Sequence, residues 1–272
     1  MMSSSLVKYV LPVTLALVPF APSALAQDVD ETSSEAPWSM ADKYWGEEEM
    51  AASREAVQAA NGDLTTFMIM ADRLEVQSSD DEDILIWDAQ GWYGGDINKL
   101  YLKSEGEFSF EDDEIEDAEL QALWSRAISP FWDLQAGVRQ DFEPKGRTHA
   151  VVGIQGLAPY WFEVDAAAFL STDGDVSARI EGEYELRISQ RLVLQPRAEI
   201  EFSAQDIPEL EIGSGLTGID AGVRLRYEFK REFAPYVGVE WQSSFGETRD
   251  LVTATGSDGD KVVAVAGLRA WF

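Results

Sequence analysis

The chain has 272 residues, 21 Lys and Arg against 50 Asp and Glu, and a formal net charge of -29. It contains no cysteine and one histidine, which excludes disulfide frameworks, zinc ribbons, iron-sulfur sites, cysteine nucleophiles and His-rich metal cages. The acidic charge argues against nucleic acid as a partner, because phosphate backbones are bound by Lys and Arg, and it favours cations.

The first 26 residues have the pattern of a secretory signal peptide. Lys8 precedes an apolar run broken by two prolines, and Ala24-Leu25-Ala26 supplies small residues for cleavage before Gln27. The run is about 12 residues long, whereas a membrane-spanning helix needs roughly 20. The sequence therefore predicts a signal peptide over 1–26 rather than a transmembrane helix.

The next segment, 27–63, is polar, acidic and rich in Ala and Ser. Three glutamates at 47–49 open an alanine-rich stretch that ends at Asn61-Gly62, a pattern typical of a short helix. The segment has too few large apolar residues to form a core. We expect an acidic periplasmic arm that is partly helical or disordered.

From 64 to 272 the chain consists of segments of roughly 10 to 14 residues in which apolar and polar residues alternate, separated by turn residues. The stretch 176–188 is a clear case, with one apolar face opposite a polar and charged row. That row is Ser177, Arg179, Glu181, Glu183, Glu185 and Arg187. Alternation of this kind predicts antiparallel strands with one face in an apolar environment and one in a polar one.

A soluble sandwich would also alternate, but three features favour a transmembrane outer-membrane β-barrel. The apolar faces end in aromatic residues, as interfacial girdles require. Tight turns alternate with long acidic loops, and the final strand ends in Phe272, which resembles the insertion signal of outer-membrane proteins. The aromatic residues are Trp132, Trp161, Phe202, Tyr227, Phe229, Trp241 and Trp271.

The fold class predicted is therefore all-β: an antiparallel barrel over 64–272 with an N-terminal arm. An even number of strands lets a barrel close with both termini in the periplasm. Twelve strands are predicted, over 65–76, 84–93, 99–108, 118–128, 131–142, 147–157, 160–170, 176–188, 192–202, 218–229, 235–245 and 261–272.

Several long sequence segments in this region resemble those of a known protein family. They are 87–96 (WDAQGWYGGD), 98–106 (NKLYLKSEG), 123–139 (LWSRAISPFWDLQAGVR), 155–165 (QGLAPYWFEVD), 190–197 (QRLVLQPR) and 231–241 (REFAPYVGVEW). In this order they closely resemble the copper resistance protein B family of the bacterial outer membrane. The resemblance implies a twelve-stranded barrel that handles copper, as Cu(I) or Cu(II), together with periplasmic copper proteins of the same resistance system.

The segment that precedes the barrel differs in composition from that of other family members. Family members often carry a Met- and His-rich segment there, which suits copper because thioether and imidazole groups select it over hard cations. Here the arm offers only Met40 and Met50. The copper-storing role of the arm is thereby put in doubt.

Candidate soft ligands remain in the barrel. His149 shares a face with polar residues and is expected to lie in the lumen, as a copper ligand or as a hydrogen-bonded luminal histidine. Met68 and Met70 share a face of the first strand, opposite Phe67 and Ile69, where they could pass Cu(I) along or simply pack.

The carboxylates on the polar faces are the candidate hard ligands, and Asp88, Glu163 and Asp165 are the three we single out. The whole set is Asp88, Glu105, Glu107, Asp133, Glu163, Asp165, Glu181, Glu183, Glu199, Glu201 and Glu240. They alternate with Lys and Arg, so most could form an ion-pair network that stiffens or plugs a narrow barrel. An acidic excess near the openings would still draw cations inward.

We therefore expect a non-enzymatic outer-membrane barrel, in contact with lipid, that binds and transports or exports copper ions. One alternative is a structural barrel or a general cation-selective pore. Another is an outer-membrane lipase or protease, for which His149 would be the one available base. No Gly-x-Ser-x-Gly motif accompanies it, and its expected luminal position argues against lipid chemistry.

Overall fold

The computed structural model describes residues 39–62, 64–79, 82–256 and 258–272. The predicted signal peptide and the first part of the predicted arm lie outside these residues. The chain divides into two compact units, one ending at Val57 and one running from Gln58 to Phe272, and each is described by itself.

The first unit is helical where it is described. It contains η1 (Ser39–Ala41), α1 (Asp42–Trp45) and most of α2 (Glu47–Asn61), so the predicted short helix is present. Three glutamates occupy the first turn of α2, where negative charge stabilises the exposed N–H groups. Arg54 pairs with Asp42 at 2.7 Å, and none of the residues of α2 is buried.

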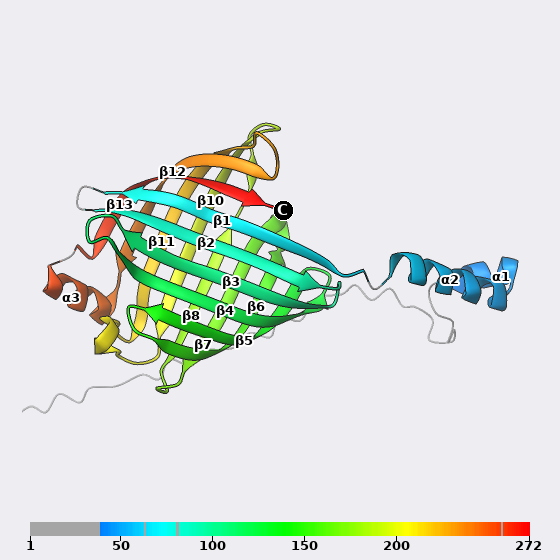
Figure 1. Ribbon diagram of the computed structural model, residues 1–272, viewed down its shortest axis with the longest axis horizontal. Coiled ribbons are helices and arrows are strands. Elements are labelled where there is room, and N and C mark those ends of the chain that lie inside the picture. Colours follow the sequence, from blue (N-terminus) through cyan, green and yellow to red (C-terminus); the bar gives the residue numbers. More distant parts are fainter. Residues whose placement is uncertain (1–38, 63, 80–81, 257) are drawn as a thin grey trace, which may run out of the picture. The chain divides into compact units, whose positions relative to one another are not determined.

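The second unit is a closed antiparallel barrel (Figure 1). Pairing of β1 with β13 and of β10 with β11 closes the sheet, so twelve strands form the wall. The strands are β1 (Thr66–Ser78), β2 (Asp83–Gly94), β3 (Asn98–Ser109), β4 (Glu114–Ser129), β5 (Trp132–Glu143), β6 (Arg147–Ala158), β7 (Phe162–Ser171), β8 with β9 (Val176–Glu183 and Leu186–Arg187), β10 (Leu192–Ser203), β11 (Gly215–Tyr227), β12 (Phe233–Ser244) and β13 (Asp260–Trp271). The predicted fold class and strand number are confirmed.

The strand predicted over 176–188 is interrupted, and Pro196 explains why. Tyr184 donates its backbone N–H to the carbonyl of Pro196 at 3.1 Å, but proline has no N–H to return. The ladder therefore breaks at Tyr184 and Glu185, and the wall strand appears as β8 followed by the short β9.

The two ends of the barrel differ. The first strand begins at Thr66 and the last strand stops at Trp271 on the same side of the barrel, which we call the turn end. The connections between strands at the turn end are short and include η2 (Pro159–Trp161). The other end, the loop end, carries η3 (Pro208–Leu210) and α3 (Gly246–Thr255), so two of the connections expected as long acidic loops contain a 3-10 turn and a short α-helix.

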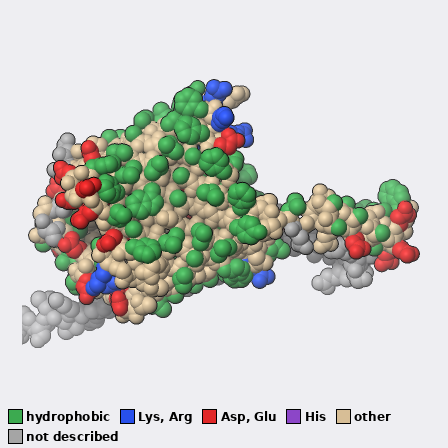
Figure 2. All heavy atoms as spheres, in the orientation of Figure 1, with side chains coloured by type: hydrophobic (Ala, Val, Ile, Leu, Met, Phe, Trp, Pro, Cys, Tyr) green, Lys and Arg blue, Asp and Glu red, His purple; other side chains and the backbone are tan. Residues whose placement is uncertain are grey.

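The outer wall is apolar. Figure 2 shows hydrophobic side chains spread over the barrel, with acidic side chains gathered at the end that carries α3. Because the closed sheet satisfies its own backbone hydrogen bonds, such a wall can face hydrocarbon without a free edge. The exposed aromatic residues include Tyr93, Phe131, Trp161, Phe229 and Phe272 near the turn end, and Phe110, Phe142 and Trp241 nearer the loop end. No helix among the described residues combines the length and apolar character needed to cross a membrane.

Candidate metal centre in the barrel lumen

The strand alternation places the charged faces inside the barrel. On β5, for example, Val138 is half exposed on the outside, whereas Gln135 and Asp141 are buried in the lumen. The luminal side chains form ion pairs with neighbouring strands, such as Arg197 with Glu181 at 2.6 Å. The predicted division into a lipid face and a luminal face therefore holds.

Other ion pairs cross the lumen. Arg179 on β8 donates to Glu105 on β3 at 2.8 Å, although β4 to β7 lie between these strands in the sheet. Arg224 on β11 donates to both carboxylate oxygens of Glu75 on β1, at 2.9 and 2.7 Å. Many of the luminal carboxylates are thus partners in an ion-pair network. The sequence alone leaves this open for most of them, as the alternative to a role as metal ligands.

One part of the lumen has far more carboxylates than bases. A cavity of about 310 Å³, which we call the turn-end cavity, is bordered by only two basic side chains, Lys103 and Arg269. Its carboxylates are Asp72, Asp88, Glu105, Glu163, Asp165, Glu181 and Glu183. The three carboxylates singled out from the sequence, Asp88, Glu163 and Asp165, therefore meet at one cavity.

The pairing of the strands sets acids directly opposite one another at this cavity. Asp165 is opposite Glu181 and Glu163 is opposite Glu183 across β7 and β8. Asp88 is opposite Glu105 across β2 and β3. Like charges in directly opposed positions destabilise a sheet, and a cation bound between them would remove that cost.

The bases at the cavity compensate only part of this charge. Lys103 reaches Asp165 from β3, and Arg73 contacts Asp88 at 3.3 Å. Arg269 pairs with Asp72 at 2.8 Å but is 3.8 Å from Glu183. Carboxylate oxygens bind hard and borderline cations, so the chemistry of the cavity suits a divalent metal ion.

Asp72 enters the cavity through a β-bulge that sequence reasoning missed. The register of β1 shifts between Ala71 and Leu74, which leaves Asp72 as the extra residue of the strand. A bulge re-aims side chains, and here Asp72 and Arg73 both face the lumen. The signal in the sequence is the adjacent pair of charged residues, which breaks the alternation of β1.

The two methionines lie on the luminal face of β1. Phe67 and Ile69, on the opposite face of the strand, are exposed on the outside of the barrel. The sulfur of Met70 is 3.6 Å from a guanidinium nitrogen of Arg269, which borders the turn-end cavity. Met68 pairs with Trp92 farther toward the turn end. Met70 is therefore the thioether that lies next to the cavity.

His149 is luminal, as predicted, but borders a different cavity of about 110 Å³ at the loop end. Its Nδ1 is 3.5 Å from Asp141 and has no hydrogen-bond partner among the described residues. Arg139 is directly opposite His149 in the sheet, and Arg147 borders the same cavity. The structure thus separates the histidine from the methionines and places it beside Arg139 and Arg147 as well as Asp141.

The loop between β10 and β11 lines the cavity that contains His149. Ile207, Leu210 and Ile212 are the loop residues that line this cavity. Glu209 of the same loop pairs with Lys145 and, at 3.1 Å, with Arg147. The hydrogen bond from Lys145, followed by the charges of Lys145 and Arg147, holds the pKa of the Glu209 carboxyl below its usual value. The loop is therefore tied to the β5–β6 hairpin by ion pairs.

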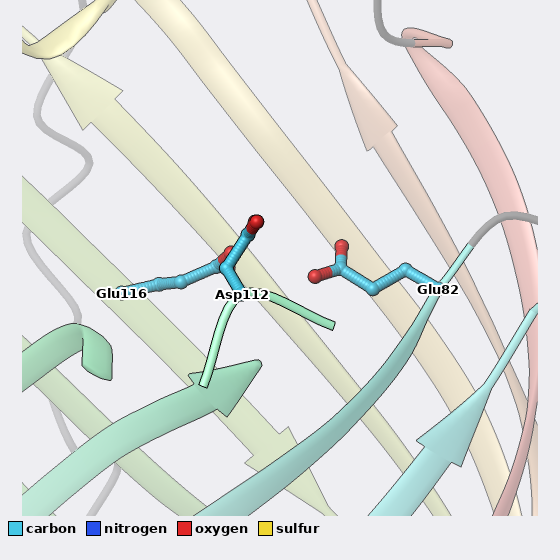
Figure 3. A group of neighbouring side chains, drawn as sticks. All are labelled: Glu82, Asp112 and Glu116. Carbon is cyan, nitrogen blue, oxygen red and sulfur yellow. The ribbon is translucent and has the colours of Figure 1, made fainter. Parts of the chain in front are cut away.

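A second acidic group lies on the surface of the loop end. Figure 3 shows the carboxylates of Glu82, Asp112 and Glu116 directed toward one another, with oxygens within 4.8 Å. Asp112 and Glu116 are exposed, and Ser109 donates a hydrogen bond to Glu82 at 2.6 Å. These side chains add to the negative charge at the loop-end mouth.

Comparison with known proteins shows a family for this chain. Residues 65–272 match the family model described as "Copper resistance protein B precursor (CopB)". The chain is 46% identical over 207 residues to copper resistance protein B of Escherichia coli, covering 76% of this chain and 69% of that protein. It is 45% identical over 204 residues to the copper resistance protein B homolog of Pseudomonas syringae pv. tomato, strain ATCC BAA-871 / DC3000, covering 75% of this chain and 69% of that protein.

Solved structures of outer-membrane proteins are similar at low sequence identity. NanC porin matches with a TM-score of 0.49 and 11% identity over 76% of this chain and 100% of the porin chain. KdgM porin matches with a TM-score of 0.45 and 12% identity over 76% and 99%. Outer membrane phospholipase A from Escherichia coli matches with a TM-score of 0.42 and 14% identity over 76% and 92%.

Proposed function

This chain belongs to the copper resistance protein B family, and from that membership we propose that its outer-membrane barrel binds copper ions in the turn-end cavity of the lumen. A role in copper resistance at the outer membrane follows from the family. The observation that carries the more specific proposal is the meeting of Asp88, Glu163 and Asp165 with four further carboxylates around about 310 Å³.

The ligands proposed are oxygens from opposed strands. Glu163 and Asp165 on β7 face Glu183 and Glu181 on β8, so a cation between the strands would be held from two sides. Oxygen donors favour Cu(II) over Cu(I), which prefers thioether and thiolate groups. Met70 would add a soft ligand only after Arg269 moves away from it.

The side of the membrane follows from the lengths of the connections. Barrels of this class have short periplasmic turns and longer extracellular loops. The turn-end cavity would then exchange copper with the periplasm, where partner copper proteins of the same resistance system would deliver or collect it. Carriage of copper across the membrane would require a further step through the lumen.

His149 is the second candidate ligand, in its own cavity. The unpartnered Nδ1 and Asp141 at 3.5 Å could share a metal ion, but Arg139 and Arg147 disfavour a cation there. We therefore rank this position below the turn-end cavity. Because the imidazole faces the lumen and not lipid, it also gives little support to a lipase, and the relatives point to a non-enzymatic protein.

The test uses two matched changes in the purified full-length barrel. Asp165→Asn alters the turn-end cavity, and Asp133→Asn removes a luminal acid that also pairs with a lysine of β3 but does not border the cavity. We expect Asp165→Asn, alone and with Glu163→Gln, to weaken Cu(II) binding measured by calorimetry by about tenfold or more. Asp133→Asn should bind as the unaltered chain does.

Copper tolerance of cells that express each variant gives the second readout. The proposal predicts that tolerance falls with the cavity variants and not with Asp133→Asn. Equal copper affinity in the double variant and in Asp133→Asn would exclude the turn-end cavity as the binding site. A barrel that conducts several cations equally and binds none would instead favour a general acidic pore.

A further inference from the structure

A further luminal cavity borders the turn-end cavity, and three arginines lie at the boundary between the two. The mid-lumen cavity, of about 200 Å³, is lined by Arg73, Arg179 and Arg197 together with several carboxylates, among them Glu107 and Asp220. We call these three arginines the arginine layer. Each of them pairs with a carboxylate that faces the turn-end cavity.

The three pairs are close and come from different parts of the wall. Arg73 contacts Asp88 at 3.3 Å, and Arg197 contacts Glu181 at 2.6 Å. Arg179 reaches across the lumen to Glu105 at 2.8 Å. The three arginines therefore border the mid-lumen cavity, whereas Asp88 and Glu181 border the turn-end cavity and Glu105 borders both.

A buried apolar cluster on β3, β4, β6 and β7 lies beside the arginine layer. Tyr101, Leu123, Val151 and Phe169 form a buried cluster on these strands. Arg179 lies against this cluster, with its guanidinium 6.0 Å from the Phe169 ring centre. Arg179 borders the mid-lumen cavity, a small cavity of about 40 Å³ beside the turn-end cavity, and the cavity that contains His149, so a cation that moves from the turn end toward the loop end meets this residue.

We infer that the arginine layer is the barrier to cation passage through this barrel, and that Arg179 is its decisive member. Fixed positive charge in a narrow pore repels cations even where the pore is otherwise acidic. The layer separates two acidic cavities, so the turn-end cavity exchanges cations with the turn end while the layer is intact. This inference concerns passage of ions and goes beyond the binding of copper.

Arg179 also has an alternative set of partners. Besides Glu105 it contacts Glu119 on β4 at 3.4 Å, also across the lumen, and Glu199 at 3.2 Å and Glu201 at 3.5 Å on the neighbouring β10. If the guanidinium leaves Glu105 and Glu119 and stays with the two acids of β10, it no longer spans the lumen. The other two arginines pair with adjacent strands and remain at the wall.

Conductance of the purified barrel in planar lipid bilayers, in potassium chloride, tests the inference. We expect low conductance for the unaltered chain and a several-fold increase, with stronger cation selectivity, for Arg179→Gln. The control is Arg226→Gln, which removes one luminal charge paired with Glu185 and Glu228 but borders neither cavity. This control should conduct as the unaltered chain does.

Folding of each variant is checked by its heat-modifiable migration on a gel. If Arg179→Gln does not fold, the double change Glu105→Gln with Glu119→Gln releases Arg179 from its partners across the lumen and should also raise conductance. The inference is overturned if a folded variant conducts no more than Arg226→Gln, or if the unaltered barrel already conducts as an open pore. Because potassium is the ion measured, the result does not depend on whether the turn-end cavity binds copper.

Discussion

Glu163 lies directly opposite Glu183 across the pairing of β7 with β8, with both carboxylates at the turn-end cavity. The closest basic side chain to this pair in the ion-pair network is Arg269, 3.8 Å from Glu183. Two acids in opposed positions lower the stability of a sheet. Their presence is understandable if the position serves to hold a cation rather than to strengthen the wall.

The first prediction follows from this arrangement. Glu163→Gln should raise the free energy of unfolding of the metal-free barrel by about 0.2 to 1 kcal/mol, because it removes one of the two opposed charges. The same change should reduce the stabilisation that added Cu(II) gives, since a bound ligand stabilises the folded state by an amount that grows with the logarithm of its affinity. Urea unfolding in lipid vesicles, with and without Cu(II), measures both. A loss of stability in the metal-free variant would contradict this account.

Much of this fold can be predicted from the sequence because the alternation has a period of two. The charged row of 176–188 and the apolar residues opposite it suffice to divide lumen from lipid, and Asp88, Glu163 and Asp165 follow from parity. That parity cannot tell which luminal residues meet across the barrel, since that depends on strand register and curvature. The bulge at Asp72 likewise changes parity locally, so its entry into the cavity emerges only from the structure.

A second prediction concerns the brace between Arg224 and Glu75. The Glu75 side chain is fully buried and accepts two hydrogen bonds from Arg224, which also pairs with Glu240 at 2.5 Å. Arg224→Met should destabilise the barrel by about 3 to 5 kcal/mol, because it leaves buried carboxylates without their cation. Urea unfolding in vesicles measures the loss.

The control for that change is Lys99→Met, which breaks the more exposed pair of Lys99 with Asp133. Its cost should be about 1 kcal/mol or less, as for solvent-accessible pairs. Equal losses in the two variants would show that burial does not determine the contribution of these ion pairs.

A third prediction separates the soft ligands. Met70 lies beside Arg269 at the turn-end cavity, whereas Met68 pairs with Trp92 and His149 borders the loop-end cavity. Met70→Leu should therefore weaken binding of silver, the Cu(I) mimic, more than Met68→Leu does, with Cu(II) binding little changed in both. His149→Gln should leave Cu(II) binding within about twofold if the turn-end cavity is the main site. A larger loss in His149→Gln would move the site to the loop end.

A fourth prediction concerns the loop between β10 and β11. Glu209 joins this loop to Lys145 and Arg147, and its pKa lies below the ordinary value of 4.5, with the hydrogen bond from Lys145 as the main cause. A carboxyl with a lowered pKa stabilises the docked loop at pH values above its unfolded pKa, and that stabilisation is lost as the pH falls through the lower folded value. The loop should therefore be docked at neutral pH and loosen in acid below about pH 4.5.

Spin-label mobility measures this loosening directly. The chain has no cysteine, so Glu211→Cys gives a unique labelling position on an exposed part of the loop. The label should become more mobile at low pH, and Glu209→Gln should produce the same mobility at neutral pH. Asp175 also titrates in acid, with a pKa lowered mainly by its hydrogen bond from Gln205, so the neutral-pH variant isolates the contribution of Glu209.

The ion pairs of Glu209 are exposed on the carboxylate side, so high salt should weaken the docking at neutral pH as well. Glu232→Gln, an exposed acid at the turn end, serves as the control and should leave the label unaffected. If label mobility is the same in Glu209→Gln as in the control at neutral pH, the apolar contacts of Ile207 hold the loop and the ion pairs do not.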